Sequence, residues 1–144
     1  MNRGINFKKK ARIVVVDDNY DHLSGIKELI EVESDFEVVA IASSANVGIS
    51  LIKKFRPELV LMDINMPVMN GYDATKKIRE SGKDDAKTIP IYAMTANAFT
   101  TDVTAALDAG MNGHIAKPIE TDVLYKTLKE AFAKQDALKQ KEEA

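Results

Sequence analysis

The chain has 144 residues, the length of one ordinary domain with a single core. With 20 Lys and Arg against 22 Asp and Glu, its net charge is -2, which disfavours direct binding of nucleic acid or an anionic membrane. The absence of cysteine excludes disulfides, thiolate zinc sites and cysteine nucleophiles, and no apolar run is long enough to span a membrane. The composition predicts a cytoplasmic protein with no membrane anchor in this segment.

Five short apolar runs predict β-strands. The first three, at residues 13–16, 38–41 and 59–62, are continuous rather than alternating, which is typical of parallel strands buried on both faces. Weaker runs follow at residues 91–94 and 114–116.

Segments with helical spacing separate these runs. Two of these segments, at residues 71–80 and 99–109, are predicted to be helical from their composition. The other three have apolar residues on one helical face: Leu23, Ile26 and Ile30 in the first, Val47, Leu51, Ile52 and Phe55 in the second, and Leu124, Leu128 and Phe132 in the last. Five strand–helix pairs in succession predict an α/β fold, (βα)5, with a doubly wound parallel sheet between two layers of helices. We expect the domain to span residues 12–132, with a linker or tail at 1–11 and a helix extension or tail at 133–144.

Polar residues stand at the carboxyl ends of four of the five predicted strands. Asp17 and Asp18 follow the first, Asp63 the third, Thr95 the fourth and Lys117 the fifth. In an open sheet of order 2-1-3-4-5, ligands bind at this edge between strands 1 and 3. The three aspartates are therefore expected to lie together, although Asp17 taken alone is more typical of a turn or helix cap.

Such a carboxylate cluster requires a cation or a raised pKa. Oxygen ligands favour a hard ion, and the small number of carboxylates suits Mg²⁺ sharing its shell with a phosphate. The Lys117 ammonium suits a phosphoryl oxygen and can pair with Asp63 when no phosphate is bound, and the Thr95 hydroxyl can donate to the same group. A solvated loop charge is the alternative for Lys117.

Four motifs match one family in order and spacing. They are VVDDN at residues 15–19, LMDINMP at 61–67 with Gly71 beyond it, MTANA at 94–98, and Lys117 with Pro118. Over residues 12–132 the chain resembles the receiver domains of two-component response regulators. The resemblance implies a flavodoxin-like fold of order 2-1-3-4-5, in which Asp63 accepts a phosphoryl group from a histidine kinase or a histidine phosphotransfer protein and later loses it by slow self-dephosphorylation.

The resemblance also implies a metal site and a phosphate site. Asp18, Asp63 and the backbone carbonyl of Asn65 would bind Mg²⁺ directly, and Asp17 would act through a water molecule. Thr95, Ala96 and Lys117 would contact the phosphoryl group.

Further residues have implied roles in the surrounding loops and in switching. Pro67 and Gly71 would shape the loop after the acceptor, and a cis bond is expected before Pro118. His114 stands where the family often has a Tyr or Phe switch, so it either swings inward or stays at the surface. Asn65 and Asn97 occupy positions that tune the lifetime of the acyl phosphate.

The output face implied by the resemblance consists of the fourth helix, the fifth strand and the fifth helix, through which a homodimer can form. The sequence of residues 89–98 and 109–119 is most like that of the receivers of hybrid sensor histidine kinases, and a stand-alone response regulator is the alternative. A phosphatase of the haloacid-dehalogenase type needs a second Asp where Asn65 stands. A flavodoxin-like binding module is disfavoured because the acidic turn at residues 17–19 would repel a phosphate.

Overall fold

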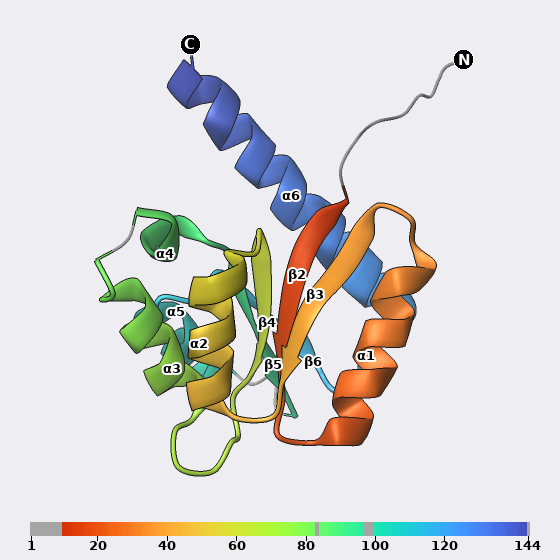
Figure 1. Cartoon of the computed structure of the whole chain (residues 1–144), viewed down its shortest axis with the longest axis vertical. Helices are drawn as coiled ribbons and strands as arrows, with labels where there is room; N and C mark the ends of the chain where they lie inside the picture. Colours follow the sequence, from red (N-terminus) through yellow and green to blue (C-terminus); the bar gives the residue numbers. More distant parts are fainter. Residues whose placement is uncertain (1–9, 83, 97–99, 144) are drawn as a thin grey trace.

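A five-stranded parallel sheet runs through the middle of the molecule, with helices on both of its faces (Figure 1). The computed structural model describes residues 10–82, 84–96 and 100–143. The strands are β2 (Ala11–Val16), β3 (Phe36–Ala42), β4 (Leu59–Asp63), β5 (Ile91–Thr95) and β6 (Gly113–Ala116). Their spatial order, β3-β2-β4-β5-β6, confirms the predicted order 2-1-3-4-5.

Five of the helices alternate with the strands, and α4 is an additional short helix before β5. The helices are α1 (Tyr20–Val32), α2 (Ala45–Phe55), α3 (Gly71–Arg79), α4 (Asp84–Thr88), α5 (Thr100–Ala109) and α6 (Thr121–Glu143). Among the helices that the structure describes, none is long and apolar enough to cross a membrane.

Each face of the sheet has its own hydrophobic core, because successive side chains of a strand point to opposite faces. In β2, Ile13 and Val15 face α1 and α6, whereas Val14 and Val16 face α2, α3 and α5. All four side chains are fully buried. This explains why the strand sequences are continuously apolar, as the sequence analysis predicts for parallel strands.

The predicted apolar face of the second helix is partly wrong. Val47 is 49% exposed, and the residues of α2 that are buried are Ala45, Gly48 and Ile52. The reason is the close approach of α2 to β2: a Cβ atom at Gly48 would lie 2.8 Å from a methyl group of Val16. Position 48 therefore has no room for a side chain, and Val47 is directed outward.

The guanidinium of Arg79, at the end of α3, ties together the segments around α4 and α5. It donates to the carbonyl oxygens of Gly110 and Ala86 and to the side chain of Asn112, at distances of 2.8 to 3.0 Å. The Asn112 side chain in turn accepts a hydrogen bond from the backbone N–H of Ile91 at 2.9 Å. These contacts fix the loops on the amino-terminal side of β5 and β6.

The observed ranges of α5 and α6 refine two of the predicted segments. Residues 133–143 continue α6 as helix, which is one of the two alternatives left open by the sequence. The predicted helix at 99–109 is observed as Thr100–Ala109, and residues 97–99 lie outside the described part of the chain.

Candidate functional site

Asp17 and Asp18 lie where β2 ends and the chain turns into α1. The backbone N–H of Asp17 still pairs with the β3 carbonyl of Ala42 at 3.0 Å, and the Asp17 carboxylate, which is fully buried, accepts from the backbone N–H of Asn19 at 2.9 Å. Asn19 caps α1 by accepting from the N–H of His22. These bonds fix the turn, so that Asp17 points inward while Asp18 is exposed.

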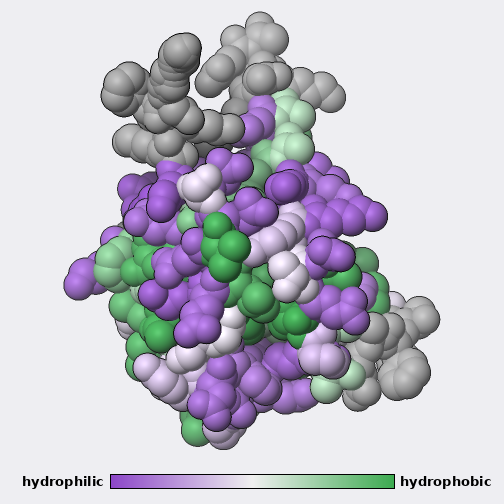
Figure 2. All heavy atoms as spheres, turned by 90° about the vertical axis from the view of Figure 1, so that its right-hand side faces the viewer, coloured by the Kyte–Doolittle hydropathy of each residue, from purple (hydrophilic) through white to green (hydrophobic). Residues whose placement is uncertain are grey.

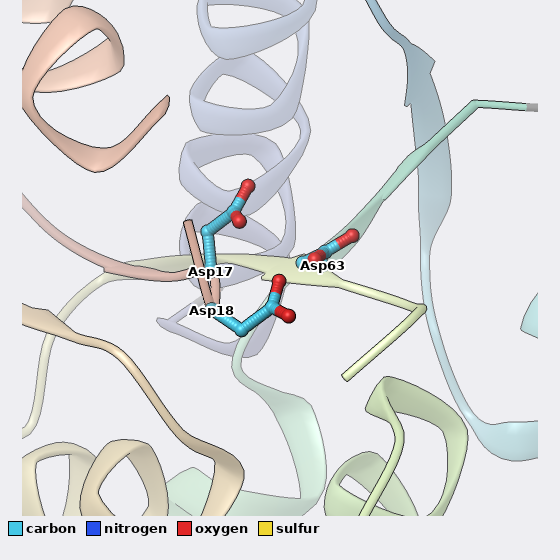
Figure 3. A group of neighbouring side chains, drawn as sticks. All are labelled: Asp17, Asp18 and Asp63. Carbon is cyan, nitrogen blue, oxygen red and sulfur yellow. The ribbon is translucent and has the colours of Figure 1, made fainter. Parts of the chain in front are cut away.

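Asp63 is the last residue of β4 and is 4% exposed. Asp17, Asp18 and Asp63 each have a carboxylate oxygen within 4.8 Å of the others. Figure 3 shows them on the adjacent ends of β2 and β4, with the carboxylate of Asp18 directed toward Asp63. The structure therefore brings together the three aspartates that the sequence analysis places at this edge.

Lys117, in the loop after β6, reaches across this cluster. Its ammonium donates to Asp17 Oδ2 at 2.8 Å and to Asp63 Oδ1 at 3.3 Å, and lies 3.4 Å from His22 Nδ1. The predicted pairing with Asp63 is present, but Asp17 is the nearer partner. One ammonium among three carboxylates leaves the cluster with an excess negative charge when all are ionised.

The pKa values of Asp63 and Lys117 are both raised, for different reasons. The pKa of Asp63 is raised from 3.8 to about 6, chiefly by burial and then by the negative charge of Asp17, against the opposing effect of Lys117. Burial alone would lower the pKa of Lys117, but the hydrogen bond to Asp17 and the charges of Asp63 and Asp17 outweigh it and raise that pKa. The cluster thus favours a cation over an additional negative charge.

Asp18 and Asp63 open onto a hollow of about 340 Å³ that is also lined by Asn19, His22, Asn65, Ala96 and Lys117. The side chains of Asp17, Asp18 and Asp63 offer carboxylate oxygens, the ligand atoms that Mg²⁺ prefers. A divalent cation would also balance the excess negative charge of three carboxylates and one ammonium. The residues present therefore fit Mg²⁺.

The loop after Asp63 folds back on itself against the start of α3. The N–H of Gly71 donates to the carbonyl of Ile64 at 2.9 Å, and a Cβ at Gly71 would collide with the carbonyl oxygen of Asp63. The exposed Pro67 accepts from the N–H of Met69 at 2.7 Å in the same loop. Gly71 therefore allows the close contact that fixes the backbone at the end of β4.

The other predicted site residues lie on β5, on β6 and in the loops that follow them. Thr95 ends β5 and is buried, and its carbonyl accepts from the N–H of Lys117 at 2.7 Å. The Lys117–Pro118 peptide bond is cis. His114 is partly buried on β6, where it pairs with Ala93.

One residue with a predicted role cannot be placed, and one residue of the site was not predicted. Asn97 lies outside the described residues. His22 was not predicted to belong to the site, although its position in the first turn of α1, four residues after Asp18, was the available signal.

Comparison with known proteins gives a consistent result. Residues 13–129 match the family model of the response regulator receiver domain. The chain is 31% identical over 129 residues to the transcriptional regulatory protein DegU of Brevibacillus brevis, covering 90% of this chain and 52% of that protein. It is 29% identical to protein PilH of Pseudomonas aeruginosa, covering 85% of this chain and 98% of that protein.

The fold also matches solved structures of response regulators. The crystal structure of a putative response regulator from Chloroflexus aurantiacus superposes with a TM-score of 0.79 at 27% identity, covering 87% of this chain and 99% of that one. The chain spans about half the length of several curated relatives that it matches, DegU among them. The order of the motifs, the sheet and the acidic edge agree with these matches, and the chain belongs to the response regulator receiver family of two-component signalling.

Proposed function

We propose that this receiver accepts one phosphoryl group on Asp63, in a Mg²⁺-dependent transfer from the phosphohistidine of a histidine kinase or a histidine phosphotransfer protein. The observation that carries the proposal is the position of the Asp63 carboxylate. It lies in an open hollow, beside two further carboxylates that suit a divalent cation and within reach of the Lys117 ammonium.

In the transfer, a carboxylate oxygen of Asp63 attacks phosphorus, the P–N bond breaks, and its electron pair returns to the imidazole of the donor. Asp18, Asp63 and the Asn65 carbonyl would hold Mg²⁺, with Asp17 acting through water. Bound there, Mg²⁺ offsets the negative charge of the transferring oxygens.

Lys117 and Thr95 act on the product. The Lys117 ammonium exchanges its contact with Asp63 Oδ1 for a phosphoryl oxygen, since a lysine is a mobile point charge on a flexible chain. The hydroxyl of Thr95 and the backbone at Ala96 meet the same group. Slow attack of water on the acyl phosphate then releases inorganic phosphate and returns Asp63 to its free carboxylate.

The signal leaves through the face formed by α5, β6 and α6, which is also where a homodimer would form. The bond from the Lys117 N–H to the Thr95 carbonyl joins the two loops that contact the phosphoryl group, so that they move together. His114 lies on β6 between these elements and serves as the switch side chain. Leu107 on α5 and Val123 on α6 are about half-exposed and available to a partner.

The donor protein approaches along α1. A groove of about 540 Å³ lies between α1 and the loop after Lys117, with Leu29, Val32 and Ile119 in its lining, and it shares Lys117 and His22 with the hollow at Asp63. The molecule as seen from the α1 side carries hydrophobic patches between polar side chains (Figure 2). A protein seated in this groove would have its histidine at the acceptor.

The module belongs to a cytoplasmic signalling pathway, either within a hybrid histidine kinase or as a stand-alone response regulator. The resemblance of residues 89–98 and 109–119 to hybrid-kinase receivers favours the hybrid kinase. The match over 98% of the length of PilH supports the stand-alone regulator to the same extent.

The test is labelling with acetyl phosphate, followed by intact-mass measurement. With Mg²⁺ the protein should gain one phosphoryl group, chelation should slow the gain strongly, and Asp63→Asn should abolish it. Asp73→Asn, which removes an exposed carboxylate on α3, is the matched control and should label normally. Full labelling of Asp63→Asn would refute the site, and turnover of small phosphate esters would favour a phosphatase instead.

A further inference from the structure

His22 lies at the rim of the hollow, with a half-exposed side chain. Its Nδ1 atom is 3.4 Å from the Lys117 ammonium and 3.6 Å from Asp17 Oδ2. The capping bond from the His22 N–H to Asn19 holds the backbone of His22 in the first turn of α1, on the side of the acidic pair. The imidazole is thereby brought to a lysine that is 95 residues away in the chain.

The direction of the hydrogen bond between His22 and Lys117 follows from the chemistry of the two groups. A lysine ammonium has three N–H donors and no acceptor, so the nearer contact of Nδ1 requires a bare ring nitrogen. The separation of 3.6 Å between Nδ1 and Asp17 is too long for a hydrogen bond. In this arrangement Nδ1 can only accept from Lys117, which corresponds to the ring tautomer with its proton on Nε2.

We propose that His22 is a positioning residue for Lys117. Together with Asp17 Oδ2 and Asp63 Oδ1, His22 Nδ1 provides one acceptor for each N–H of the ammonium. Asp17 and His22 hold the ammonium on the α1 side, so that it can release Asp63 Oδ1 and meet a phosphoryl oxygen. This role rests on the proposed transfer to Asp63.

Without His22, the ammonium would share its hydrogen bonds between the two carboxylates and water. Its pairing with Asp63 would strengthen, and that pairing competes with attack by the same carboxylate on phosphorus. A side chain at position 22 that has no hydrogen-bond acceptor is therefore expected to slow phosphorylation. A side chain that lacks the imidazole ring but keeps a hydrogen-bond acceptor is not expected to slow it.

The first experiment observes the hydrogen bond directly by long-range ¹H–¹⁵N correlation NMR of the metal-free protein. The expected signature of His22 is a bare Nδ1 and a protonated Nε2. In His22→Leu, the ammonium hydrogens of Lys117 should exchange with water faster than in the wild type. A proton on Nδ1, or unchanged exchange in the leucine variant, would overturn the proposal whether or not Asp63 is phosphorylated.

The second experiment compares initial rates of labelling by acetyl phosphate with Mg²⁺. His22→Leu should slow labelling by about threefold to tenfold, as expected for one lost hydrogen bond. His22→Asn, which can place an oxygen near the position of Nδ1, should restore most of the rate. Lys77→Leu, an exposed change on α3 outside the lining of that groove, should label at the wild-type rate.

Each other result has a distinct meaning. Equal rates in all variants, equal slowing by Leu and Asn at position 22, or slowing by Lys77→Leu would overturn the positioning role. A wild-type protein that is not labelled at Asp63 would instead refute the proposed function, and the NMR signature would still decide whether His22 accepts from Lys117.

Discussion

Replacing Asp63 with asparagine is expected to stabilise the metal-free protein at neutral pH. Burial and the neighbouring Asp17 raise the pKa of Asp63 from 3.8 to about 6. The folded protein therefore binds this proton more tightly than the unfolded chain does. Ionisation of Asp63 then costs folding free energy, and asparagine, which is similar in shape and carries no charge, removes that cost.

The size of the effect follows from the shift. About two pKa units correspond to roughly 3 kcal/mol, and Asp63 is only 4% exposed, so solvent screening takes little from this value. The variant also loses the attraction between the carboxylate and Lys117 but keeps an oxygen that can accept from it. We expect a gain of about 2 kcal/mol in the free energy of unfolding at pH 7.

The pH dependence gives the sign of the effect. The stability that a protonated Asp63 provides is fully present below pH 3.8 and is lost as the pH rises through about 6. The advantage of Asp63→Asn should therefore be largest above pH 6 and fall to about a third of its value at pH 4.5.

Urea unfolding in the presence of a chelator, at pH 7 and pH 4.5, measures these differences. Asp136→Asn, an exposed change on α6, is the control and should have little effect. Saturating Mg²⁺ should stabilise the wild type, since a ligand that binds the folded state stabilises it. The difference in the free energy of unfolding between Asp63→Asn and the wild type should therefore become smaller. An Asp63→Asn protein that is less stable than the wild type at pH 7, or a gain that is the same at both pH values, would refute the reasoning.

Three further predictions concern stability in urea. Gly71→Ala should lose about 2–4 kcal/mol, because its Cβ would collide with the backbone at the end of β4, whereas Gly25→Ala, with open space around its Cβ in α1, should gain about 0.5–1 kcal/mol; similar effects of the two changes would contradict this account. Arg79→Met should lose about 2–4 kcal/mol with its hydrogen bonds, and the exposed Lys76→Met should lose much less; equal losses would count against the clamp around α4 and α5. Val68 is fully exposed at a φ of 70°, a left-handed conformation that a β-branched residue disfavours, so Val68→Asn should gain about 1 kcal/mol, and a loss would argue against that strain.

The sheet and the acidic edge were predictable from the sequence because both follow from local patterns. Continuous β-branched runs, such as the one that became β2, indicate strands buried on two faces. Once the strands are parallel, the residues that follow them must share one edge. The proximity of Asp17 and Asp63 is a consequence of topology rather than of any particular side-chain conformation.

The features that were missed depend on distances between elements. The outward position of Val47 results from how closely Gly48 lets α2 approach β2, and helical periodicity does not contain that distance. The contact of His22 with Lys117 joins α1 to a loop near the other end of the chain. The short helix α4 is only five residues long, too short to show a helical period.

The most direct test of the proposed transfer is to locate the phosphoryl group itself. The protein is labelled by acetyl phosphate with Mg²⁺, the acyl phosphate is reduced with borohydride, and the peptides are sequenced by mass spectrometry. Reduction converts a phosphorylated aspartate to homoserine. The proposal predicts homoserine at position 63, and homoserine at another aspartate, or at none in a protein that has gained the mass of a phosphoryl group, would contradict it.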